Sequence, residues 1–178
     1  MKRMLQDQLY VKYPKIFVNK DRSMRESCLY FGLECGDGWY DILDHLCAAL
    51  SYVYSTGFYI GDEYVSVEPP QVVADQIKEK FAELRVYYHL EYPESFNEQC
   101  KAYPDAQKIM DSYHDYFSGI VYMAESMSER ICEETGLSGE LHVSGGTRYG
   151  WYKTLNREYA KTNEGCIKRG YVPVADLP

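Results

Sequence analysis

The feature that most constrains this chain is a helical pattern that runs without interruption from Asp105 to Glu134. Residues at steps of three and four lie on one face of an α-helix. We therefore expect one long helix, about residues 105–134, with its apolar face buried against the rest of the protein. Gly119 lies inside the pattern and allows a bend or a division into two helices. The apolar positions are Ile109, Tyr113, Tyr116, Ile120, Met123, Met127 and Ile131, and the stripe is widened by Met110, Phe117, Val121 and Ala124.

The opposite face of the same helix is acidic. Acids one turn apart lie about 5–6 Å from each other, broadly like the charges along a nucleic-acid backbone. A protein groove lined by Lys and Arg would attract such carboxylates as it attracts phosphates. The alternative is a solvated helix face, which most acidic helix faces are. The candidate partner-binding residues are Asp111, Asp115, Tyr122, Glu125, Glu129 and Glu133.

Charge is divided unevenly along the chain, which has a net charge of −8. Residues 1–25 hold seven basic and two acidic side chains, residues 26–147 hold six basic and 22 acidic, and residues 148–178 hold six basic and three acidic. An acidic middle segment repels nucleic acid and favours a basic partner. We expect that partner to be a basic protein or ribonucleoprotein of the host, with the basic N-terminal segment docked on the acidic body.

Length and composition are those of a globular protein. A chain of 178 residues with 46% hydrophobic content can bury a real core, so we expect a single domain, 1–178. No apolar run is long enough to cross a bilayer, and no secretory signal follows Met1, so we expect a cytoplasmic protein without a membrane partner. The six cysteines are scattered, which indicates reduced thiols. The 19 tyrosines suit a protein-binding surface, and with the wide apolar seam they allow a dimer.

The remaining patterns predict an α+β fold. Three or more helices, one of them long, should pack on a small, mainly antiparallel sheet that ends in a C-terminal hairpin and helix. The clearest strand is 84–90, where Leu84, Val86, Tyr88 and Leu90 alternate inward. Asp37 is placed to cap the first clear helix. The expected strands are 28–34, 64–67, 84–90 and 140–143, the expected helices are 39–55, 71–82 and 151–161, and the tail from Gly165 should be irregular.

Three segments carry distinctive motifs: Gly36–Asp44 (GDGWYDILD), Ile77–Tyr88 (IKEKFAELRVYY) and Ala124–Ser128 (AESMS). They resemble a family of uncharacterised phage and prophage proteins, whose members are similar to GDGWYDLID, VKEKFGxLRFY and AExxSxxxCxxCG followed by GWxxTLCxxH. The resemblance covers about half of the chain and is fairly specific in the order of its motifs. It implies phage origin and no established activity.

The last part of the family pattern is similar to a small zinc ribbon. Here Cys132 keeps only the first cysteine, while Asn156 and Tyr159 stand where further ligands would fall. Structural zinc needs about four nitrogen or sulfur ligands. We therefore expect residues 132–160 to form a zinc-ribbon-like subregion without metal. The side chains expected to hold it by packing are Tyr149, Trp151 and Leu155.

Other metal and catalytic patterns are weak. Asp41 and His45 lie one turn apart but on an expected solvent face, and the spacing of Cys166 and His142 matches no usual zinc site. No phosphate-binding loop is present, although combinations of cysteine and histidine remain open. We expect no metal and no cofactor.

The function favoured by these patterns is that of a non-enzymatic, phage-derived inhibitor of the anti-CRISPR or DNA-mimic type. It would bind a host nucleic-acid-handling complex, such as a CRISPR effector nuclease, through the acidic helix face. Replacing Glu125 and Glu129 by lysine should then abolish binding and leave the fold intact. The alternatives are a small phage enzyme, such as a hydrolase or nuclease, and a DNA-binding accessory protein that uses the basic chain ends. Net charge argues against direct nucleic-acid binding.

Overall fold

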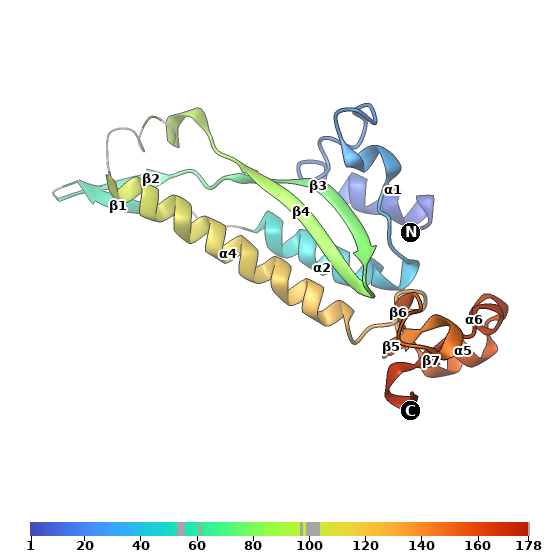
Figure 1. Ribbon diagram of the computed structural model, residues 1–178. Coiled ribbons are helices and arrows are strands. Elements are labelled where there is room, and N and C mark those ends of the chain that lie inside the picture. Colours follow the sequence, from blue (N-terminus) through green and yellow to red (C-terminus); the bar gives the residue numbers. More distant parts are fainter. Residues whose placement is uncertain (53–55, 61, 97, 99–103, 178) are drawn as a thin grey trace.

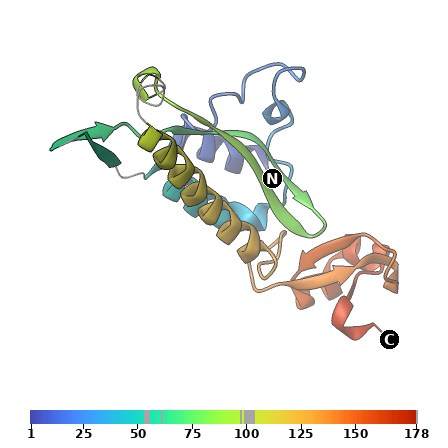
Figure 2. The same ribbon diagram turned by 60° about the vertical axis from the view of Figure 1, so that its left-hand side comes forward.

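The computed structural model describes residues 1–52, 56–60, 62–96, 98 and 104–177, and it has the expected α+β architecture (Figure 1). The long helix α4 runs beside the shorter α2, and both lie along a twisted β-hairpin. A small lobe of strands and short helices follows at the C-terminal end of α4 (Figures 1 and 2). The helices are α1 (Arg3–Lys12), α2 (Tyr40–Ser51), α4 (Pro104–Ser128), α5 (Arg157–Thr162) and α6 (Glu164–Arg169).

All strand pairs within the three sheets are antiparallel. A short hairpin joins β1 (Thr56–Ile60) to β2 (Glu63–Val67), and a long one joins β3 (Gln71–Lys80) to β4 (Glu83–Glu91). The third sheet has the order β6-β5-β7 and forms the C-terminal lobe. Its strands are β5 (Glu140–Val143), β6 (Tyr152–Leu155) and β7 (Val172–Pro173).

One core joins α1, α2, α4 and the β3–β4 hairpin. Its largest fully buried side chains include Trp39, Phe17, Phe117 and Leu43. The basic N-terminal segment is docked on this body, as expected, because Lys12 pairs with Asp44 at 2.7 Å and Lys2 pairs with Asp37 at 2.8 Å. Asp37 therefore anchors Lys2; it does not cap α2 with its side chain, as the sequence had suggested.

The buried stripe of α4 lies toward one side of the broad face that was expected. Its buried positions are Tyr113 of the predicted seam, Phe117, Val121 and Ala124, which were expected to widen it, and Ser128. Three members of the predicted seam remain substantially exposed: Tyr116, Met123 and Met127. The prediction of a broad apolar face was right, but the prediction of which residues occupy the core was wrong for these three.

The long helix also ends earlier than expected. It stops at Ser128 and not at Glu134. The Ser128 hydroxyl oxygen accepts the backbone N–H of Leu84 at 2.8 Å, and the chain after it turns away. Ile131 pairs with Ser138 in an isolated bridge that closes a tight loop. Gly119 neither bends nor divides α4, which is one continuous helix.

Of residues 71–82, expected as a helix, 71–80 form strand β3, and Phe81 and Ala82 form the turn to β4. Val73, Ile77 and Phe81 have helical spacing, but a bulge between Ala74 and Gln76 hides the alternation of the strand. Pairing with β4 then decides the conformation. The predicted strand 84–90 is confirmed as part of β4, with Leu84 and Val86 buried.

Three further predictions about local structure were wrong. Residues 28–34, expected as a strand, hold a 3₁₀ turn (Cys28–Phe31). The expected helix 151–161 is divided into strand β6 and helix α5, and the tail expected to be irregular holds α6 and β7. Strands 64–67 and 140–143 are confirmed. The expected end of the helix 39–55 falls on residues 53–55, outside the described residues, and α2 ends at Ser51.

Candidate partner-binding surface

The outer side of α4 carries an exposed line of residues, here called the acidic strip: Asp111, Asp115, Tyr122 and Glu129. Three of its members belong to α4, and Glu129 is the first residue after the helix. Tyr122 is 74% exposed, although its ring is large and mostly apolar. These four are the predicted site residues that the fold leaves accessible.

Glu125 does not belong to this exposed line. Its carboxylate oxygen Oε1 accepts the backbone N–H of Val86 at 2.9 Å, and Oε2 lies 3.5 Å from the Arg85 guanidinium. An edge strand presents unpaired N–H groups, which proteins cover or cap. Glu125 caps the edge of β4 in this way, so we interpret it as a structural residue.

Glu133 is also turned inward and is only 4% exposed. Its carboxylate accepts the backbone N–H of Gly36 at 3.0 Å and pairs with Lys153 at 2.9 Å. Burial raises the pKa of Glu133, while Lys153 acts in the opposite direction. Burial alone would lower the pKa of Lys153, but Glu133 and Glu134 raise it above its usual value. The prediction that Glu133 extends the exposed line is therefore wrong.

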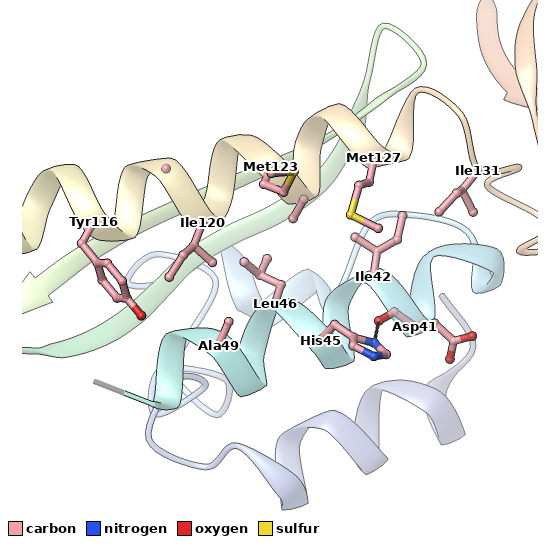
Figure 3. A pocket seen from close by; sticks show the side chains of 12 residues that line it. Asp41, Ile42, His45, Leu46, Ala49, Tyr116, Ile120, Met123, Met127 and Ile131 are labelled. Carbon is pink, nitrogen blue, oxygen red and sulfur yellow. Dashed lines mark hydrogen bonds between the residues drawn. The ribbon is translucent and has the colours of Figure 1, made fainter. Parts of the chain in front are cut away.

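An apolar groove of about 590 Å³ lies between α2 and α4 (Figure 3). Side chains of α4 line one wall, including Tyr116, Met123 and Met127, and Ile42 and Leu46 of α2 line the other. Met123 is 64% exposed, so the groove is open to solvent. Exposed apolar patches with polar borders mark interaction sites in soluble proteins.

Asp41 and His45 stand at the α2 border of this groove, on the solvent side as expected. The His45 Nδ1 lies 2.8 Å from the backbone oxygen of Asp41 and not from its carboxylate. Within the described part of the chain, no three His, Cys, Asp or Glu side chains gather in a way that could hold a metal ion.

The Gly-Asp-Gly-Trp motif lies against the loop that follows α4. Gly38 donates its N–H to the backbone oxygen of Glu133 at 2.7 Å, and the Trp39 Nε1 donates to that of Ile131 at 2.8 Å. A Cβ on Gly38 would lie 2.3 Å from a backbone oxygen of this loop, so only glycine permits the contact. The motif therefore joins the main body to the C-terminal lobe.

The other two motifs meet nearby. Ser128, at the end of the Ala-Glu-x-x-Ser motif, binds Leu84 of the hairpin motif. The backbone oxygen of Ala82, at the hairpin tip, accepts the Thr154 hydroxyl of β6 at 2.8 Å. All three motifs thus hold elements together at one end of the molecule, and their shared chemistry is structural.

The C-terminal lobe has a small core of its own, which contains Leu155, as expected. The prediction that Tyr149 and Trp151 hold this lobe was wrong, because they are 99% and 65% exposed. The Asn156 side chain accepts the N–H groups of Glu158 and Tyr159 and so caps α5. Asn156 stands where the zinc-ribbon pattern would have a metal ligand, and here its side chain caps a helix.

A second groove lies between the end of β4 and the first half of α4. It contains His89 and His114, and the Nδ1 of His89 lies 2.9 Å from the carboxylate of Asp75. Both side chains of this pair are nearly half exposed. The pair thus lies on an open surface in contact with water.

No match to this chain is found among protein-family models, curated proteins or solved structures. The resemblance to phage proteins therefore remains a prediction. In the described residues, no helix is both long and apolar enough to traverse a bilayer.

Proposed function

We propose that this protein is a non-enzymatic binding protein, of phage origin, that inhibits a nucleic-acid-handling protein of the host by covering a basic surface of it. The observation that carries the proposal is the outer side of α4, where the carboxylates of Asp111, Asp115 and Glu129 flank the exposed ring of Tyr122. Tyrosine is a frequent binding hot spot, and charged residues around it steer a partner of opposite charge.

Charge density argues against a literal copy of DNA by one chain. The acidic strip spans 18 residues of helical rise, roughly 27 Å, with three carboxylates. That is about one charge per 9 Å, whereas duplex DNA carries about one per 1.7 Å. We therefore infer that the strip forms individual ion pairs with Lys and Arg of the partner, and that Tyr122 supplies apolar contact. A CRISPR effector nuclease remains one candidate within this class of target.

The test is capture from a bacterial lysate with immobilised wild-type protein, followed by elution with excess duplex DNA. We expect the eluate to contain a basic nucleic-acid-binding protein, since DNA and the acidic strip would compete for one surface. The nuclease or DNA-binding activity of the eluted protein should fall when the wild-type chain is added back. An eluate without any nucleic-acid-binding protein would overturn the proposal.

The variant for this test is Asp111→Lys with Asp115→Lys and Glu129→Lys, all three at exposed positions. It should fold normally and lose capture. The matched control is Glu158→Lys with Glu164→Lys, two exposed acids of the C-terminal lobe, which should retain it. Equal capture by both variants would show that the acidic strip is not the contact surface.

A further inference from the structure

One face of α4, which includes the groove residues Tyr116, Gly119 and Met123 and lies next to the acidic strip, has a size pattern that the single chain does not explain. Small and large residues alternate along it at steps of four and three: Ser112, Tyr116, Gly119, Met123, Ser126 and, in the turn after the helix, Arg130. All six are exposed. Steps of this kind give the seam along which two helices pack.

Gly119 is the least expected member. Glycine inside a helix costs about 1 kcal/mol relative to alanine. A Cβ at Gly119 would meet no atom within 4 Å, so packing within the chain does not require glycine here. Close approach of a helix from another molecule would require glycine at this position.

We propose that this face binds the same face of a second copy, with the two α4 helices antiparallel around a two-fold axis that passes between Gly119 and Met123. In this register Met123 of each copy packs on Gly119 of the other, and Tyr116 packs on Ser126. Each large side chain thus meets a small one, which is the self-complementarity that a two-fold interface requires. A shift by one heptad also opposes small to large residues, but it matches only four of the six residues of this face, whereas the proposed register matches all six.

Charge is complementary in the same register. Arg130, which forms no ion pair with any residue in the described ranges, faces Ser112 of the second copy. It lies there within one helical turn of Asp115, whose side chain is 88% exposed. The two-fold axis repeats this ion pair, so each dimer contains two.

The dimer goes beyond the proposed function, although it would serve it. A two-fold axis perpendicular to both helices places the two acidic strips on the same side of the dimer. Six carboxylates would then lie on one surface; the two of Asp115 pair with Arg130 across the dimer, and the four of Asp111 and Glu129 remain for the partner.

The test is sedimentation equilibrium of the full chain over a wide concentration range. Wild type should fit a monomer–dimer equilibrium, and Gly119→Leu, which meets nothing in its own chain, should remain monomeric with unchanged helix content. Arg130→Glu and Asp115→Arg should each raise the dissociation constant by about tenfold, because two exposed pairs are lost per dimer. The double variant Asp115→Arg/Arg130→Glu should restore it, and Lys168→Glu on α6 is the neutral control.

A wild-type chain that is monomeric at every concentration would overturn the dimer, as would a Gly119→Leu chain that dimerises equally well. Neither result bears on the proposed function, because monomeric Gly119→Leu keeps all four residues of the acidic strip. Capture by that variant, tested separately, distinguishes failure of the dimer from failure of partner binding.

Discussion

Glu125→Lys should destabilise the protein, contrary to the expectation from sequence that this residue only contacts a partner. In the structure its carboxylate caps the free edge of β4 through the Val86 N–H and lies beside Arg85. Lysine cannot accept the Val86 hydrogen bond, and it places a second positive charge next to the guanidinium.

The magnitude follows from these contacts. A hydrogen bond to a charged group is worth about 1.5–3 kcal/mol, and the Val86 N–H, in a residue that is 8% exposed, would lose its acceptor. The Arg85 pair is partly exposed and adds about 0.5 kcal/mol. We expect Glu125→Lys to lower the free energy of unfolding by about 2–4 kcal/mol. Glu125→Gln keeps an acceptor oxygen and should cost about 1 kcal/mol.

The assay is urea unfolding followed by far-UV circular dichroism, with all variants at one protein concentration. Glu129→Lys is the matched control, because it makes the same charge change at an exposed position four residues away, and it should stay within about 0.5 kcal/mol of wild type. If Glu125→Lys were as stable as Glu129→Lys, the capping role of Glu125 would be refuted.

Three other predictions concern packing and titration. Phe81→Gly should raise the free energy of unfolding by about 1 kcal/mol, or the melting temperature by about 2–4 °C, because Phe81 has a φ of 57° that favours glycine and a side chain that is 73% exposed. A lower melting temperature would contradict this. Gly38→Ala should lower the free energy of unfolding by more than about 3 kcal/mol, since the new Cβ meets backbone atoms of the loop after α4. A free energy of unfolding in urea within about 1 kcal/mol of the wild-type value would be inconsistent with that contact. Burial raises the pKa of Cys47 to about 12 from 9.0, so its thiol stays protonated in the folded state while the unfolded state ionises. Its stabilising contribution is therefore complete below pH 9.0 and is lost as pH rises toward 12, at up to about 1.4 kcal/mol per pH unit. Over that pH range, the free energy of unfolding of Cys47→Ala should decline less steeply than that of wild type.

The α+β class and strand β4 could be predicted from the sequence because their signals are local. The alternation of Leu84, Val86 and Tyr88 belongs to one strand and needs no knowledge of its neighbours. Strand β3 was missed because its bulge disturbs the same alternation and leaves Val73 and Ile77 at helical spacing. A period read from a short segment fails wherever the strand adds a residue.

The candidate site was predicted only in part for a different reason. On α4 the sequence indicates which residues are apolar or acidic, but the packed elements decide which of them are covered. Glu125 and Glu133 satisfy backbone N–H groups of Val86 and Gly36, which are 39 and 97 residues away in the chain. The spacing of residues along one helix does not reveal contacts with such distant parts of the chain. Asp111 and Asp115 remain exposed in the first half of α4, where Asp111 borders the groove at the end of β4.

The central claim is that the outer side of α4 is the surface through which this protein binds its target. Its most direct test is photo-crosslinking in a bacterial lysate, with a photoreactive amino acid at Tyr122 and, as control, at the 99% exposed Tyr149 of the C-terminal lobe. We predict that the Tyr122 position crosslinks to a basic nucleic-acid-binding protein, that excess duplex DNA suppresses this product, and that the Tyr149 position yields none of it. Crosslinking of that protein from Tyr149 alone, or a Tyr122 product that duplex DNA leaves unchanged, would contradict the claim.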